Sequence, residues 1–337
     1  MISYNNDKPL DFNQVLKQEK EIYKKQLINR NEEALLIDLD IIKKRKIKTF
    51  SDRVYNRLQN LFILKNEKYP DIIWRKILSN LYLEGKINAL NCSQINSSMI
   101  LWILIEKKII NNTEIIIKYY PFSNWEKLTI FSNISNNGFT NIYYPFNYID
   151  FYTKKEKECS PKWWDFTPER LENLSNWEMH FREYTKNYFK DIIKKWFIIY
   201  DPACSTGTFL WYIKNHFPWC KTIGQDLSEE MTNYAKNFVD EIYTGDAINS
   251  PIPNNFVDIM FLRFLNSEIV TTSKSYELFD ILEKKVKKWW YIVLFWHTAV
   301  LLKQEYFLEH RNFKILKSSW YDPNNNTIFQ YYVIKKE

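Results

Sequence analysis

The chain from residue 197 onward alternates between short apolar runs and longer stretches with helical periodicity. Runs such as "FIIYDPA", "CKTIGQD" and "EIYTGDA" have the length of buried strands and end in turn-forming residues. Between them, "GTFLWYIKNHF" and "SEEMTNYAKNFV" repeat apolar residues every three or four positions, which is typical of helices. Strands that alternate with helices predict a mainly parallel sheet covered on both faces.

The same alternation continues toward the C-terminus. "FVDIMFLR" and "WWYIVLFWH" are predicted strands, and a helix is expected over residues 274–288 between them. Two last strand-like runs, at 312–322 and 327–336, are joined by a short Pro- and Asn-containing turn and predict a hairpin. We therefore expect an antiparallel strand near one edge of the sheet.

The N-terminal part has a different pattern. Residues 10 to about 110 repeat apolar positions at helical spacing, as in Val15, Ile22 and Leu27, and are predicted to be mostly helical. Short β-rich runs follow, and one of them, residues 127–135, is predicted to be a strand.

The charged stretch "TKKEKECSPK" separates the two patterns. We expect a mainly helical domain with some strands over residues 1–155, which covers the ligand site of the other domain, holds substrate or binds a partner. The second domain is expected over 156–337, and it opens with a helix whose first residue is Pro168, capped by Thr167.

Composition narrows the function classes. The net charge of +7 is small for 337 residues and the basic clusters are short, so we expect no nucleic-acid partner. Cys92, Cys159, Cys204 and Cys220 share no metal-ligand spacing, which predicts no metal site, and so few cysteines fit a reducing compartment. The apolar runs are too short to span a bilayer and the N-terminus resembles no signal peptide. A cytoplasmic protein without a membrane partner is expected.

Each of the first three strands of this sheet ends in an acid, namely Asp201, Asp226 and Asp246. One such residue alone is more often a helix cap, but in a doubly wound sheet the carboxyl ends of the strands hold the ligand. Asp226 follows Asp201 by 25 residues, and a carboxylate there can accept both hydroxyls of a ribose. Asp246 can accept from the exocyclic amine of an adenine, and Ala247 leaves room for the flat ring. The loop that follows Asp201 lacks the GxGxxG and Walker patterns that bind pyrophosphate groups. A nucleoside with a small zwitterionic tail is therefore a better fit than a pyrophosphate.

The segments "DPACSTGTFL", "IGQDLSEEM" and "YTGDAINSPIPNNFVDIMFL" resemble motifs I, II and III to IV of class I S-adenosylmethionine (SAM)-dependent methyltransferases, over about 197–337. The resemblance implies an α/β fold with a Rossmann-like, seven-stranded sheet, and SAM as cosubstrate or sole substrate. It implies that the loop after Asp201 binds the methionine part of SAM, that Asp226 binds the ribose and that Asp246 binds the adenine. The implied binding residues are Asp201, Ala203, Cys204, Ser205, Thr206, Gly207, Gln225, Asp226, Leu227, Met231, Asp246 and Ala247, with Arg182 for a carboxylate.

Two departures refine the resemblance. DNA-amino methyltransferases often have "DPACGTG", but they carry an Asn/Asp-Pro-Pro-aromatic motif where this chain reads "FLRFLNSE", so DNA bases are rejected as acceptors. The spelling of the first two motifs, preceded by "LSNWEMHFREYT", is similar to the branch that includes isonocardicin synthase and the azetidine-2-carboxylate synthases. That branch attacks the 3-amino-3-carboxypropyl arm of SAM and releases methylthioadenosine.

Three hypotheses follow. The first is cyclisation of SAM to azetidine-2-carboxylate; the second is a methyltransferase or aminocarboxypropyl transferase that acts on a small-molecule acceptor. The third is a factor that modifies nucleic acid or protein. Candidate catalytic residues are Tyr184, Asn176 and Arg263, with Asn266 and His297 as weaker candidates, and each has an ordinary structural alternative. The sequence names no acceptor and no oligomeric state.

Overall fold

The computed structural model divides into two compact units, Met1–Lys155 with Ser319–Gln330, and Glu156–Ser318 with Tyr331–Glu337. The role of residues 1–155 as a cover or substrate domain stays a prediction. The structure describes residues 39–53, 61–66, 69–75, 100–110, 114–135, 140–143, 153, 155–156, 158–159, 168–267, 269–296, 299–309, 312–323 and 327–337.

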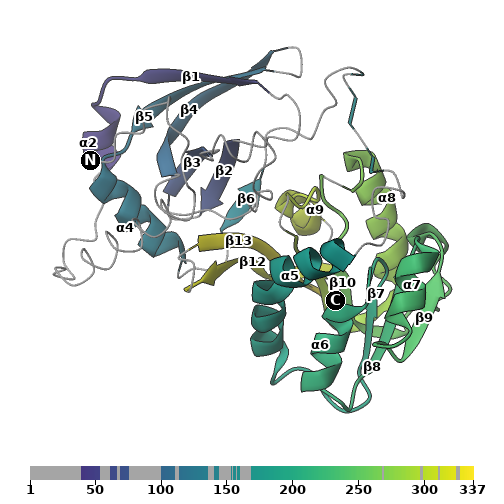
Figure 1. Ribbon diagram of the computed structural model, residues 1–337. Helices are drawn as coiled ribbons and strands as arrows, with labels where there is room; N and C mark the ends of the chain where they lie inside the picture. Colours follow the sequence, from purple (N-terminus) through teal and green to yellow (C-terminus); the bar gives the residue numbers. More distant parts are fainter. Residues whose placement is uncertain are drawn as a thin grey trace. The chain divides into compact units, whose positions relative to one another are not determined.

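The larger sheet, shown in teal to yellow in Figure 1, has seven strands in the order β12-β13-β11-β10-β7-β8-β9. Neighbouring strands from β11 to β9 pair in parallel, and β13 pairs antiparallel with β11. The predicted sheet with its antiparallel strand near one edge is therefore confirmed. The strands are β7 (Ile198–Asp201), β8 (Lys221–Asp226), β9 (Glu241–Thr244), β10 (Val257–Leu262), β11 (Val286–Leu294), β12 (Phe313–Asp322) and β13 (Thr327–Lys336).

Helices connect these strands, and their ends follow local capping rules. Ser228 accepts a hydrogen bond from the Met231 N–H, as expected of a helix cap, and Thr271 caps the Lys274 N–H in the same way. The helix expected over 274–288 ends earlier, because Val286 is buried and already pairs with Val257 in the sheet. The described helices here are α5 (Pro168–Phe189), α6 (Thr208–His216), α7 (Glu229–Ala235), α8 (Thr272–Leu282), α9 (Gln304–Glu309) and the 3-10 turns η4 (Ala247–Asn249) and η5 (Glu283–Lys285). Thr167 lies outside the described residues.

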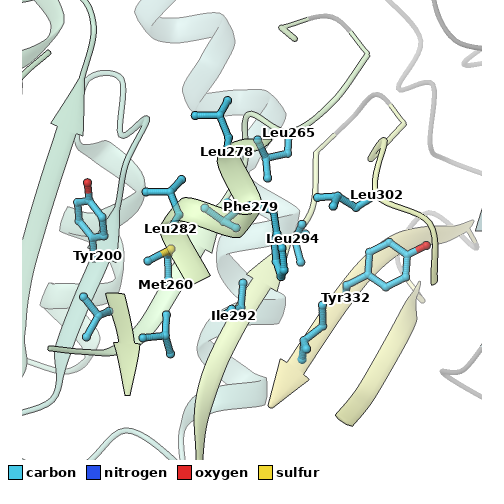
Figure 2. Packing of buried hydrophobic residues seen from close by; sticks show 14 of the residues in the cluster. Tyr200, Met260, Leu265, Leu278, Phe279, Leu282, Ile292, Leu294, Leu302 and Tyr332 are labelled. Carbon is cyan, nitrogen blue, oxygen red and sulfur yellow. The ribbon is translucent and has the colours of Figure 1, made fainter. Parts of the chain in front are cut away.

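The helix α8 packs against one face of this sheet through the buried side chains drawn in Figure 2. Phe279 and Leu282 are fully buried and pack with Met260, Ile292 and Leu294 from the two central strands. Burial of one such side chain contributes about 1.5–3 kcal/mol, so this helix is fixed where its N-terminus reaches the carboxyl edge of the sheet.

The first unit contains a second sheet. For the residues that the structure describes, the prediction of a mainly helical domain is therefore wrong. Its six strands pair antiparallel in the order β1-β5-β4-β3-β2-β6. Runs of β-branched residues such as "ILWILIEKKII" favour extended backbone, and strand pairing overrides the helical spacing of their apolar positions. Val15, Ile22 and Leu27 lie outside the described residues. The elements are α2 (Leu39–Lys43), β1 (Lys48–Arg53), β2 (Leu61–Asn66), β3 (Tyr69–Arg75), β4 (Ile100–Ile110), β5 (Glu114–Pro121), α4 (Asn124–Ser135) and β6 (Asn141–Tyr143).

The strand predicted over 127–135 is also wrong, because this segment forms most of α4. Leu128, Phe131 and Ile134 recur every three residues and are all buried, which is the periodicity of a helix face. The tip of the β12–β13 hairpin belongs to this unit, where Gln330 Nε2 donates to the Ile142 carbonyl at 2.6 Å.

Candidate functional site

A cavity of about 290 Å³ lies at the carboxyl ends of the parallel strands. This edge gathers the acids that end or follow β8 and β9, since parallel strands end on the same side of a sheet. Predicted binding or catalytic residues that line the cavity are Ala203, Ser205, Asp226, Leu227, Met231, Asp246, Ala247 and Arg263. The structure therefore brings together residues that are far apart in the sequence.

The loop after β7 is tied to the end of β8 by backbone groups. The Cys204 N–H donates to the Gln225 carbonyl at 2.8 Å, and the Ser205 N–H donates to Asp226 Oδ2 at 2.8 Å. The other oxygen of Asp226 accepts from the Ser228 N–H at 3.0 Å. A carboxylate offers about four lone-pair sites, so Asp226 keeps capacity for two hydroxyl donors. Burial raises the pKa of Asp226, although these backbone hydrogen bonds oppose the rise.

Small residues in this loop allow close packing within the protein itself. Gly207 has a φ of +73°, and a Cβ there would lie 3.0 Å from the Ala235 Cβ on α7. Gly224 on β8 lets Cys204 approach, because a Cβ there would lie 2.7 Å from the Cys204 Sγ. Cys204 and Thr206 are buried and, like Gly207, do not line this cavity.

Asp246 is positioned by Gln225. The Gln225 Nε2 donates to the backbone carbonyls of Gly245 at 3.1 Å and Asp246 at 3.0 Å, and its Oε1 accepts from the Tyr200 hydroxyl. Asp246 Oδ1 itself accepts from the Ile248 N–H at 3.0 Å. Gln225 is buried and holds the backbone of Gly245 and Asp246 in place. It would therefore affect ligand binding by positioning Asp246 and not by direct contact.

A buried network of charges lies against the cavity wall. Arg263 Nε donates to Asp201 Oδ2 at 2.6 Å, its Nη1 pairs with Glu178, and its Nη2 donates to the Cys204 carbonyl at 3.3 Å. Arg182 Nη2 contacts the second oxygen of Glu178 at 3.0 Å. Two cations and two carboxylates balance each other, because unpaired charges inside a protein are costly.

The pKa shifts in this network follow from burial and pairing. Burial raises the pKa of Asp201, and the charge and hydrogen bond of Arg263 oppose the rise. Burial alone would lower the pKa of Arg263, but Asp201 and Glu178 outweigh it and raise that pKa. Sequence reasoning missed Glu178, although its position four residues before Arg182 on one helix was the signal that could have found it.

Two other catalytic candidates, Tyr184 and Asn266, are described by the structure, and neither lines the cavity. Tyr184 packs edge-on against Tyr331 with ring centroids 4.8 Å apart, and burial raises its pKa. It does not line the cavity, so its catalytic role stays a prediction. Asn266 is buried and donates to the Arg263 carbonyl at 3.0 Å. Asn176 lies on α5, but its side chain is outside the described set, as is His297.

A short strap, made of the described residues Glu156, Glu158 and Cys159, reaches another part of the cavity wall. The Glu156 carboxylate accepts from the Thr272 N–H at 2.5 Å and its hydroxyl at 3.1 Å, at the first residue of α8. The Cys159 N–H donates to the Ile269 carbonyl at 3.0 Å, and Glu158 and Cys159 line the cavity. Sequence reasoning treated this stretch only as a domain boundary.

Within the described part of the chain, no group of three or more His, Cys, Asp or Glu side chains could hold a metal ion. None of the described helices is long and apolar enough to cross a membrane.

The chain is similar in sequence to a known protein and in part to solved structures. No protein-family model matches the chain. The chain is 28% identical over 247 residues to isonocardicin synthase of Nocardia uniformis subsp. tsuyamanensis, which covers 73% of this chain and 80% of that protein. The chain is therefore similar to a known synthase, and its larger sheet has the strand order of the class I methyltransferase fold.

Solved structures with partial similarity include a SAM-dependent methyltransferase from Aquifex aeolicus. It is 19% identical, covers 51% of this chain and 100% of its own, and has a TM-score of 0.39. The plantazolicin methyltransferase BpumL in complex with SAH is 16% identical, covers 52% of this chain and 93% of its own, and has a TM-score of 0.38.

Proposed function

We propose that this enzyme is a SAM-dependent biosynthetic catalyst that cyclises the 3-amino-3-carboxypropyl arm of SAM to azetidine-2-carboxylate and releases methylthioadenosine. The observation that carries the proposal is the similarity to isonocardicin synthase over most of the chain. The branch that contains this synthase acts on the aminocarboxypropyl arm and leaves the methyl group on sulfur.

The cavity residues fit the parts of SAM. Asp226 would accept the ribose hydroxyls with its remaining lone pairs, and Asp246 with Ala247 would receive the adenine. The backbone after Pro202 would meet the methionine part, next to Arg263. The positive charge of Arg263 is balanced by Asp201 and Glu178. This wall would therefore not repel the positively charged sulfonium of SAM.

The reaction requires one C–N bond to form while one C–S bond breaks. The ammonium first loses a proton to solvent. The neutral amine nitrogen then attacks Cγ of the arm, the carbon bonded to sulfur, and the C–S electron pair stays with the sulfur of methylthioadenosine. The attacking amine must be neutral, and a desolvated pocket favours the neutral form. Phe264, Val270, Leu278 and Trp296 give the cavity apolar walls that would exclude water.

The test is to incubate the purified enzyme with SAM alone and to identify the products by mass spectrometry. Azetidine-2-carboxylate together with methylthioadenosine is expected, at a rate well above that of SAM without enzyme. The Asp226→Asn variant is the matched control, because it should reduce both products equally. If methylthioadenosine does not exceed the uncatalysed level and S-adenosylhomocysteine forms once acceptors are added, the enzyme is a methyltransferase and the proposal is wrong.

A further inference from the structure

Two tryptophans have a backbone conformation that bulky residues rarely adopt. Trp196 and Trp289 both have a φ of 71°. The exposed fractions are 77% for Trp196 and 58% for Trp289, so burial does not compensate for the unfavourable backbone. A strained position that packing does not explain is evidence for a role outside folding.

The sheet holds Trp289 in place with a local bulge. Val257 pairs with Val286, yet Ile259 pairs with Tyr291, so β11 inserts extra residues opposite Asp258. Asp258 fixes this bulge, because its Oδ1 pairs with Lys287 Nζ at 2.8 Å and its Oδ2 accepts from the Ile198 N–H at 2.8 Å. Bulges commonly redirect a side chain, and this one presents Trp289 to solvent.

A third exposed indole lies on the same edge. The Trp196 N–H donates to the Trp219 carbonyl at 3.1 Å, and Trp219 is 45% exposed. The next residues along, Phe197 just before β7 and Trp290 in β11, stack edge-to-face with ring centroids 4.6 Å apart. We call Trp196, Trp219 and Trp289 the tryptophan edge. It lies at the amino ends of the parallel strands, opposite the edge that bears the cavity.

Lysines accompany these indoles. Lys195 Nζ lies 5.3 Å from the Trp196 ring centroid, and Lys288 and Lys335 Nζ lie 5.9 and 5.8 Å from that of Trp289. Within the described residues, no carboxylate forms a salt bridge with these three lysines. Asp258 and Glu283 pair with other lysines, so the three lysines at the indoles keep their positive charge without an ion-pair partner among the described carboxylates.

We propose that the tryptophan edge binds the surface of a membrane that contains anionic lipids. Exposed Trp and Lys together are the combination enriched at the membrane–water interface, whereas lysine is depleted in protein interfaces. A second copy of this chain would bring like charges together on the same face. The contact is peripheral; the expectation of no membrane partner rested on spanning segments only.

The test is co-sedimentation with phosphatidylcholine vesicles that contain about a third phosphatidylglycerol, with pure phosphatidylcholine vesicles as reference. Binding to the anionic vesicles that weakens with salt is expected. Replacing Lys288 with Gln should weaken the partition about fivefold, the usual effect of one lysine near an anionic surface. Trp196→Gly with Trp289→Gly should weaken it by more than about tenfold.

The glycine variants also separate a surface role from a structural one. Glycine accepts a φ of 71° without strain, so the melting temperature should stay equal or rise while vesicle binding is lost. Trp211→Ala is the matched control, because Trp211 is 43% exposed on α6 and should leave binding unchanged. The proposal is overturned by equal binding of the glycine variants and the parent, by a clear fall in their melting temperature, or by binding only to an acidic polypeptide or an oligonucleotide.

Discussion

Replacing Arg263 with Met tests the buried charge network most directly. Methionine approximates the length of the arginine stem but removes every donor to Asp201, Glu178 and the Cys204 carbonyl. Glu178 keeps its contact with Arg182, so Asp201 is the carboxylate that loses its ion-pair partner. Breaking a buried pair in this way typically costs about 3–5 kcal/mol of stability.

The protonation of Asp201 sets an upper limit to this cost. Arg263 opposes the rise in the pKa of Asp201, so its removal raises that pKa further above the unfolded value. A buried carboxyl can take up a proton instead of staying charged, which costs about 1.4 kcal/mol for each pH unit above the ordinary pKa of about 3.9. The limit is therefore about 4 kcal/mol at pH 7 and about 1.5 kcal/mol at pH 5.

The assay is urea unfolding of the parent and the variant at pH 7, 6 and 5. A carboxyl whose folded pKa is raised destabilises the fold above its unfolded pKa, and this penalty shrinks as the pH falls. We expect the difference between the two proteins to shrink in the same way. Adding Asp201→Asn to the variant removes the buried charge and should recover much of the loss at pH 7. A loss below about 1 kcal/mol, or one that is constant from pH 7 to 5, would refute the reasoning.

Three further predictions test the cavity and the packing of the loop beside it. Asp226→Asn should weaken SAM binding about ten- to a hundredfold, as measured by calorimetry. In the parent protein, SAM binding should also weaken as the pH falls and Asp226 takes up a proton. This loss should begin at a higher pH than for an exposed aspartate, because burial raises the pKa of Asp226. Gly224→Ala places a methyl 2.7 Å from the Cys204 Sγ and should cost about 1–3 kcal/mol in urea unfolding, of which Cys204→Ala should recover part. Glu156→Gln loosens the strap and should raise the KM for SAM several-fold with little change in kcat; an unchanged KM would contradict the strap's role.

The larger sheet could be predicted because its elements carry their own signals. Each of its strands is a short apolar run between turn residues, and each helix has a periodic face, so local pattern and tertiary structure agree. The first unit could not be predicted in this way. In Ile-rich segments, apolar residues fall at helical and at strand spacing alike, and only pairing with distant strands decides between them. The run at 127–135 shows the reverse error, since its helix exists because Phe131 and Ile134 pack into a core.

The site was predictable where the sequence places chemistry at strand ends. Asp226, Asp246 and Ala247 reach the cavity because the carboxyl ends of parallel strands meet at one edge. Glu178 and Glu156 were missed, because each acts on a group distant in the chain: Glu178 on Arg263, and Glu156 on the N-terminus of α8. Spacing along one helix indicates the pair of Glu178 with Arg182, but it cannot indicate the distant pairs with Arg263 and with Thr272.

The small residues of the loop after β7 serve two physical purposes. A run of Ala, Cys, Ser, Thr and Gly predicts a ligand close to the backbone, and Ala203 and Ser205 do line the cavity. Gly207 and Cys204 instead make room for α7 and for β8. This inner packing orients the Ser205 N–H toward Asp226. Small residues on the inner side therefore position the loop, and those on the outer side leave space for a ligand.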